Sequence, residues 1–180
     1  MYTQQVSVYE LKKYWKTADA LAEGDSMDVI PLCYMPPWNN LCSELGWRLH
    51  RAAGGYFSKK HHGHCGVYRL IGLAAEGDLK RPATLNRVCG QDTTGTLYIG
   101  ESGSLNTRLN QLRRTLKSRE ASHNAISMLR SIPLLKLKFS PNKLAIALLF
   151  TGRNTRFVES NLIEAYMNSF GDTPPLNYRL

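Results

Sequence analysis

The stretch Gly66-Val67-Tyr68 begins the part of the chain that decides the fold, and a second triplet with a tyrosine, Tyr98-Ile99-Gly100, follows later in the sequence. Both triplets lie in short apolar runs that are rich in β-favouring residues, Gly66 to Ala74 and Thr96 to Ile99. We therefore predict two strands that form a hairpin with an enlarged loop. The second strand runs through a Gly/Ser turn into a basic helix that carries Arg108, so two tyrosines and an arginine are brought together.

The helix after the second strand has a clear buried face. Its apolar residues recur at helical spacing, at Leu105, Leu109, Leu112 and Leu116. Arg108 flanks this face, and a guanidinium turned toward a core needs an anionic partner because burying an unpaired charge is costly. The pattern therefore makes Arg108 a candidate phosphate ligand.

The C-terminal part predicts another strand and a last helix. Residues 134–139 alternate apolar side chains with lysine, residues 140–142 form a turn, and 143–150 is a nearly continuous apolar run typical of a central strand. A helix is expected over about 155–169. Glu159 lies on its apolar stripe, whereas Glu164 falls on the opposite, solvated side. A carboxylate aimed at a core or cleft indicates a cation, a metal or an arginine.

Residues 1–64 are predicted to form an N-terminal helical extension that braces the later core or binds substrate. Helices are expected over 7–23 and 40–53, and prolines between 31 and 37 exclude a continuous helix there. A loop over 58–65, at the boundary between the extension and the next domain, carries His61, His62, His64 and Cys65. No Cys-x-x-Cys pair accompanies this cluster, so a polar loop near phosphate is favoured over structural zinc.

The charge distribution favours a polyanionic partner. The net charge is +9, and residues 65–180 carry sixteen Lys/Arg against eight Asp/Glu, whereas residues 1–64 carry seven against six. Such a field binds DNA or RNA through phosphate neutralisation, although a merely basic, soluble surface is the plainer alternative. No apolar run is long enough to cross a bilayer and the start lacks a signal pattern, so we expect no membrane partner and a cytoplasmic protein.

Seven further side chains are candidate nucleic-acid contacts. They lie in the loop before the first strand, in the long loop between the strands and on the basic helix: His64, Lys80, Arg81, Arg87, Arg113, Arg114 and Lys117. A connection as long as 76–95 in a compact domain is usually functional or mobile. We expect its cations to approach the nucleic-acid backbone.

Together, Gly66-Val67-Tyr68, Tyr98-Ile99-Gly100, Arg108, Glu159 and the Pro-Leu-Asn run that ends at Asn177 resemble the GIY-YIG nuclease superfamily. The motifs occur in the family's order over residues 66–177. The resemblance implies an α+β catalytic domain over 65–180, with a small, mostly antiparallel three-stranded sheet flanked by helices. It implies a DNA endonuclease that depends on Mg²⁺ or Mn²⁺, and the long connection resembles restriction-enzyme branches of the family.

The resemblance also implies a role for each residue. Glu159 would hold the metal, Tyr68 would help activate the attacking water, and Tyr98 would contact the phosphate or the water network. Arg108 would stabilise charge at the transferring phosphate, and Asn177 would help to hold the site together. Hydrolysis of a phosphodiester needs an oriented water, a Lewis acid and a cation, which is consistent with this set.

Two positions depart from the family pattern. Glu101 stands where a lysine is common, and Leu112 stands where many members have His or Tyr. His64 and His123 are the candidates to compensate, and the sequence places neither of them in the site.

Restriction-type cleavage of double-stranded DNA is the subtype that we favour. Alternatives to restriction-type cleavage of double-stranded DNA are a branched-DNA or repair nuclease, an RNA-directed nuclease and a catalytically silent nucleic-acid-binding module. Because a single site of this kind cuts one strand, duplex cleavage implies a homodimer or two sequential events.

Overall fold

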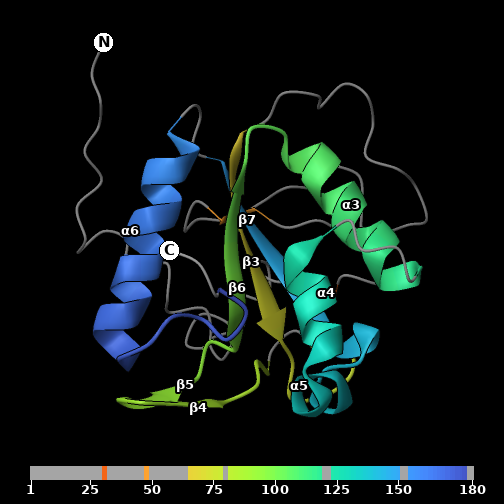
Figure 1. The fold of residues 1–180 in the computed structure, drawn as a ribbon, viewed down its shortest axis with the longest axis vertical. Helices are drawn as coiled ribbons and strands as arrows, with labels where there is room; N and C mark the ends of the chain where they lie inside the picture. Colours follow the sequence, from red (N-terminus) through yellow and green to blue (C-terminus); the bar gives the residue numbers. More distant parts are fainter. Residues whose placement is uncertain are drawn as a thin grey trace.

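The computed structural model describes residues 65–78, 81–118, 123–150 and 154–177, together with the backbone pairing of 30–31 and 47–48. One antiparallel sheet forms the middle layer, with one helix on one face and the other helices on the opposite face (Figure 1). The strands are β1 (Ile30–Pro31), β2 (Trp47–Arg48), β3 (Gly66–Gly72), β4 (Leu85–Arg87), β5 (Gly90–Asp92), β6 (Thr96–Ser102) and β7 (Leu144–Phe150). The α-helices are α3 (Leu105–Lys117), α4 (Asn124–Ser131), α5 (Pro133–Lys138) and α6 (Thr155–Phe170), and a 3-10 turn, η5 (Pro141–Lys143), precedes β7.

Three long strands carry the sheet, in the order β7-β3-β6, and all of their pairings are antiparallel. This confirms the predicted α+β class and the hairpin between the two tyrosine strands. β7 is central as well as apolar, because the short strands β1 and β2 pair with its other edge. The fully buried residues of β3 and the apolar run of β7 therefore follow from strands that are covered on both faces.

The N-terminal extension contributes strands to this sheet, which the sequence analysis did not predict. Trp47 and Arg48 pair with Leu149 and Leu148 of β7, so the helix expected over 40–53 is wrong at these two positions. The helix expected over 7–23 lies outside the described residues. The extension is thus joined to the rest of the sheet through backbone pairing at Ile30–Pro31 and Trp47–Arg48.

Residues 134–138 lie in the helix α5 and do not form the strand-like run that the alternation over 134–139 suggests. α4 ends at Ser131, and Pro133 occupies the first turn of α5. Proline is favoured at that position because the missing N–H has no partner to lose there. Leucines and lysines occur together in this segment because the leucines Leu134 and Leu137 are also exposed on the surface of α5.

Two apolar clusters fill the spaces on the two sides of the sheet. On one side, Tyr68, Leu70 and Leu97 pack with the buried faces of α3 and α4. On the other side, Val67 and Ile99 pack with α6 through Leu162 and its neighbours. Alternation along β3 and β6 thus turns Tyr68 toward α3 and α4, and turns its neighbour Val67 toward α6.

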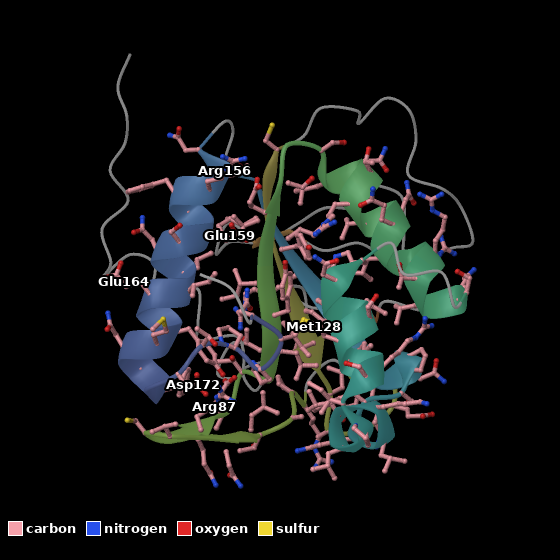
Figure 2. All side chains as sticks on the ribbon, viewed as in Figure 1. Arg87, Met128, Arg156, Glu159, Glu164 and Asp172 are labelled. Carbon is pink, nitrogen blue, oxygen red and sulfur yellow. The ribbon has the colours of Figure 1, made fainter. Side chains whose placement is uncertain are left out.

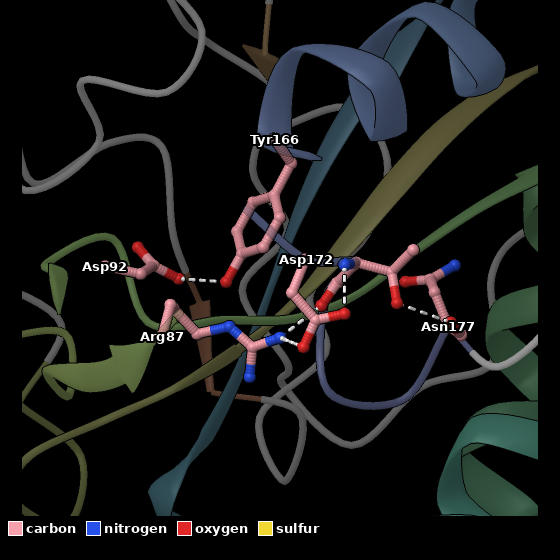
Figure 3. A network of polar contacts seen from close by, with 6 residues as sticks. Arg87, Asp92, Tyr166, Asp172 and Asn177 are labelled. Atoms are coloured by element: carbon pink, nitrogen blue, oxygen red, sulfur yellow. Dashed lines mark hydrogen bonds and ion pairs between the residues drawn. The ribbon is translucent and has the colours of Figure 1, made fainter. Parts of the chain in front are cut away.

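The long connection between β3 and β6 is ordered around the small β4–β5 hairpin. The Asp92 carboxylate accepts hydrogen bonds from Thr94 N at 2.7 Å, Thr96 N at 3.1 Å and the Tyr166 hydroxyl at 3.0 Å. Arg87 forms an ion pair with Asp172 at 2.7 Å (Figure 3). These contacts fix the hairpin to the C-terminal end of α6 and to the segment that follows it.

Gly100 is required by the two tyrosines that lie over it. A Cβ at position 100 would lie 2.7 Å from the Tyr68 hydroxyl and still closer to the Tyr98 ring. We expect Gly100→Ala to lower the free energy of unfolding by about 1–3 kcal/mol, because overpacking forces rings or backbone to shift. Urea denaturation measures this change. Gly103→Ala is the matched control, because a Cβ there meets nothing within 4 Å; equal losses in the two variants would contradict the packing argument.

Candidate functional site

The two tyrosines of the triplets lie side by side on one face of the sheet. The β3–β6 register pairs Tyr68 with Gly100 and Leu70 with Tyr98, so the tyrosines occupy adjacent places on the same side. Their ring centroids are 5.8 Å apart. Tyr68 is fully buried, whereas Tyr98 is half-buried and lines a cavity. The pair therefore combines a fully buried tyrosine with one that lines the cavity.

Arg108 reaches this pair from the first turns of α3. Ser104 caps the helix, and its hydroxyl accepts from Thr107 N at 3.5 Å. The Arg108 Nε donates to the Tyr68 hydroxyl at 3.2 Å, and another of its nitrogens donates to Gln111 Oε1 at 3.3 Å. Burial lowers the pKa of the Arg108 guanidinium, but Tyr68 and Tyr98 raise it more, so this cation stays charged. The structure thus confirms that Arg108 flanks the buried face of its helix.

His123 completes the cluster from a different helix. It immediately precedes α4, it is fully buried, and its Nε2 lies 2.9 Å from the Tyr68 hydroxyl. Burial, followed by the positive charge of Arg108, lowers the pKa of His123 to about 3. A neutral imidazole is therefore hydrogen-bonded to Tyr68 on one side while Arg108 is bonded to Tyr68 on the other.

The sequence could not place this histidine in the site. Leu112, at the position where the family often has His or Tyr, is fully buried in the apolar cluster on this side of the sheet. His123 reaches the same tyrosine from 55 residues away. Only the packing of α4 against α3 and β3 brings it there. His64, the other candidate, lies outside the described residues.

Glu159 lies on α6, on the opposite face of the sheet, and its carboxylate extends to the edge of β6. Its Oε1 accepts a hydrogen bond from the backbone N–H of Glu101 at 3.1 Å. The side chain is half-buried, and burial, then the neighbouring Glu101 carboxylate, raises the pKa of Glu159. A carboxylate in this position gains from a nearby cation, because a positive charge offsets both effects.

Glu101, which departs from the family pattern, is held beside Glu159 by the start of α6. Its carboxylate accepts from the Thr155 hydroxyl at 2.6 Å and lies 3.9 Å from Arg156 Nε. Figure 2 shows Arg156 and Glu159 on the same end of α6, near β6. Glu101 thus places a second carboxylate beside that of Glu159.

Asn177 forms hydrogen bonds to the outer edge of β6. Its Oδ1 accepts from Ile99 N at 2.8 Å, and its Nδ2 donates to Ile99 O at 2.7 Å. Leu176 N donates to Leu97 O at 2.9 Å. The backbone N–H of Glu101, which also points away from β3, donates to the Glu159 carboxylate. The open backbone groups of this edge strand are therefore satisfied by the C-terminal segment and α6, which fixes Tyr98 between Leu97 and Ile99.

A cavity of about 820 Å³ lies between α4 and α6, across the edge of β6. Tyr98, Glu159 and Asn177 line one part of it, and residues of α4 line the opposite wall. Glu164 is exposed, as predicted, but it also lines this cavity. Because residues five apart on a helix project about 140° from each other, the cavity extends from Glu159 around α6 to Glu164.

The carboxylates at the β6 edge fit a hard divalent cation. Mg²⁺ is commonly bound through one or two protein carboxylates and otherwise by water and phosphate oxygens. Glu159 has a raised pKa and uses its Oε1 for one backbone N–H, and Glu101 lies next to it. Within the described residues, no group of three or more His, Cys, Asp or Glu side chains gathers as a metal site. Glu159 is the residue that would hold such an ion, with Glu101 beside it.

The predicted nucleic-acid contacts fall into three groups. Arg114 and Lys117 are exposed on α3 and Arg113 is half-buried there, while Arg81 is exposed in the long connection. Arg87 is different: its guanidinium is engaged by Asp172 and by the carbonyl of Thr173, and it is mostly buried. A structural role therefore replaces the predicted phosphate contact at Arg87. Lys80 and His64 lie outside the described residues.

The histidine–cysteine loop also lies mostly outside the described residues, since only Cys65 is described. Its Sγ donates to the carbonyl of Gly103 at 3.2 Å, so it helps to join the start of β3 to the turn before α3. This contact gives the thiol a local structural role.

The neutral His123 should make folding stability depend on pH. Its folded pKa of about 3 lies below the ordinary 6.5, so the unfolded chain binds the additional proton between these values. The contribution of His123 to the free energy of unfolding is fully present above roughly pH 6.5. It decreases toward pH 3, by at most about 1.4 kcal/mol per pH unit. Urea denaturation at pH 7, 5.5 and 4 should therefore show a shallower loss for His123→Gln than for the wild type. Parallel losses would contradict a buried, neutral His123.

Comparisons of the chain with family models, with curated proteins and with solved structures give no match. Among the described residues, no helix combines the length and the apolar character that crossing a bilayer requires. The geometry of the cluster therefore carries the functional argument.

Proposed function

We propose that this protein is a divalent-metal-dependent DNA endonuclease of the GIY-YIG type. The observation that carries the proposal is the hydrogen-bonded chain Arg108–Tyr68–His123, which lies beside Tyr98 where the cavity holding Glu159 begins. A protein that only binds nucleic acid needs a basic surface. It has no use for a buried neutral histidine bonded to a buried tyrosine, with a carboxylate of raised pKa nearby.

Arg108 supplies the positive charge at the reacting phosphate. Its guanidinium is half-buried, remains charged and is held by Tyr68 and Gln111, so it is oriented before substrate arrives. A fixed cation in a partly dehydrated site stabilises the charge that develops on phosphoryl oxygens more strongly than a mobile surface cation does.

We assign to the two tyrosines roles that differ from those that the resemblance implies. Because Tyr98 lines the cavity and Tyr68 is fully buried, we assign contact with the attacking water or phosphate to Tyr98. Tyr68 joins Arg108 to His123. Tyr98 can take up the proton that the water releases and give its own hydroxyl proton to Tyr68, which in turn gives its own to Nε2 of the neutral His123. A bound phosphodiester offsets the Arg108 charge, which is one cause of the low His123 pKa, so substrate should make His123 a better base.

Glu159 is the residue that would hold Mg²⁺ or Mn²⁺. The chemistry that such an ion supplies is polarisation of a phosphoryl oxygen and activation of a bound water. The hydrogen bond from Glu101 N keeps the Glu159 carboxylate at the edge of β6, and Asn177 keeps that edge in place. Glu159 and Asn177 are thereby both anchored to the same edge strand, β6.

The basic surface of α3 provides the affinity for a polyanion. The helix carries Arg113, Arg114 and Lys117 beyond Arg108 and has no acidic residue. Contacts of this kind neutralise phosphates and release counterions, so binding should weaken steeply as salt rises. Double-stranded DNA is the partner that we propose, and restriction-type cleavage is the preferred subtype.

The proposal is tested by incubating the purified protein with supercoiled plasmid and either Mg²⁺ or EDTA. We expect nicked or linear product with Mg²⁺ and none with EDTA. A control with Glu76→Gln, an exposed carboxylate whose described contact is with Ser140, should cut like the wild type. Binding of plasmid without cleavage in Mg²⁺ or Mn²⁺, also on branched and single-stranded substrates, would show a silent binding module instead.

A further inference from the structure

We propose that the cavity between α4 and α6 receives one unpaired nucleoside that adjoins the scissile phosphate. This inference rests on the proposed nuclease function and specifies its substrate. The cavity volume of about 820 Å³ lies in the range of sites for single small molecules. It is large enough for one nucleoside, whereas a base pair with both of its backbones needs much more room.

The position of the cavity ties it to the reacting phosphate. Tyr98 and Glu159 belong both to the catalytic cluster and to the cavity lining. A phosphodiester held between Arg108 and Glu159 therefore has one of its two nucleosides at the mouth of this cavity. The cavity is continuous with the proposed site of chemistry.

The charge of the lining selects a base over the sugar-phosphate backbone. Among the described residues that line the cavity, two are glutamates and none is lysine or arginine. A groove that follows a DNA backbone is lined by cations. Glu164 at the rim would repel a second phosphate, so the occupant must be an uncharged group.

The chemistry of the walls fits an unstacked base. Met128 on α4 and Met167 on α6 lie on opposite walls, and Tyr98 supplies an aromatic side. Figure 2 shows Met128 on the side of α4 that is turned toward β6. Flipped or single-stranded bases stack on aromatic and apolar side chains of this kind. Asn124, an exposed lining residue, offers an amide for the edge of the base.

The first test compares substrates that differ in pairing at one nucleotide. A duplex with a mismatch or bulge next to the cut should be cleaved at least roughly tenfold faster than the fully paired duplex, because the cost of unpairing is already met. In metal-free buffer, where no cutting is expected, 2-aminopurine at that nucleotide should increase in fluorescence when the protein binds. Equal cleavage of both duplexes together with no fluorescence change at any position would overturn the inference.

Variants that fill the cavity separate this inference from the nuclease proposal. Met128→Trp, or Met167→Trp from the opposite wall, should abolish the 2-aminopurine signal and reduce cleavage at least roughly tenfold. Leu137→Trp is the matched control, because Leu137 is exposed on α5 and is not among the lining residues. A melting temperature for each variant shows that it is folded.

The two hypotheses fail in different ways. Cleavage by both filled variants at the wild-type rate, with the 2-aminopurine signal retained, would refute the pocket and leave the nuclease intact. A different outcome is that the wild type gives the 2-aminopurine signal but cuts no substrate, and that Met128→Trp abolishes the signal. That outcome would support the pocket and refute the nuclease.

Discussion

Replacing Glu159 with glutamine should lower the rate of Mg²⁺-dependent DNA cleavage by about a thousandfold or more. The loss is expected because metal-assisted charge stabilisation contributes several kcal/mol, and each 1.4 kcal/mol is a factor of ten in rate. The amide of the glutamine would keep an oxygen that can accept from Glu101 N. Cleavage under single-turnover conditions measures the effect, with Glu76→Gln as the matched control.

The same variant should not be less stable than the wild type. The pKa of Glu159 is raised by burial and by Glu101, which means that the folded protein disfavours its charged form. Removing that charge should keep or raise the melting temperature at neutral pH. A Glu159→Gln protein that melts well below the wild type would show that this carboxylate is structural, and its loss of activity would then not support metal binding.

Arg108→Ala should lower kcat by roughly 10²–10³-fold, the range found when a group that stabilises developing negative charge is removed. The variant also removes the donor to the Tyr68 hydroxyl and one of the two causes of the low His123 pKa. Arg108→Lys keeps a charge without the Nε donor, so it should recover only part of the rate. Steady-state kinetics on an oligonucleotide duplex measures both variants.

Arg114→Ala is the matched comparison on the same helix. Arg114 is exposed, so its loss should raise KM and reduce the salt dependence of binding while kcat stays near the wild-type value. If Arg108→Ala and Arg114→Ala change only KM, and by similar factors, then Arg108 is one more surface phosphate contact and has no role in the chemistry.

Local patterns were sufficient to predict the hairpin and the position of its tyrosines. Strand alternation over a paired register puts Tyr68 and Tyr98 on one face, and helical spacing places Arg108 beside the buried leucines of α3. The last helix and the inward turn of Glu159 followed from the same kind of periodicity. These features depend on neighbours that are close in sequence or on one antiparallel pairing.

The contacts that the sequence missed depend on tertiary packing. His123 meets Tyr68 only because α4 packs where it does, and no local pattern distinguishes it from the other histidines. Arg87 lies in a long loop, and only the tertiary fold brings Asp172, 85 residues further along the chain, to its guanidinium. Residues 134–138 are helical although their sequence resembles a strand, because exposed leucines on a short helix can alternate with lysine as they do on a strand.

The cluster around Tyr68 and Glu159 is proposed to hydrolyse phosphodiesters in DNA. Mapping the products of a defined, end-labelled duplex after incubation with wild-type protein and Mg²⁺ tests it most directly. We predict discrete cleavage products in each strand that is cut, and their loss with EDTA and in Glu159→Gln. Intact duplex with the wild type at every divalent metal tested, or identical products from the wild type and Glu159→Gln, would contradict it.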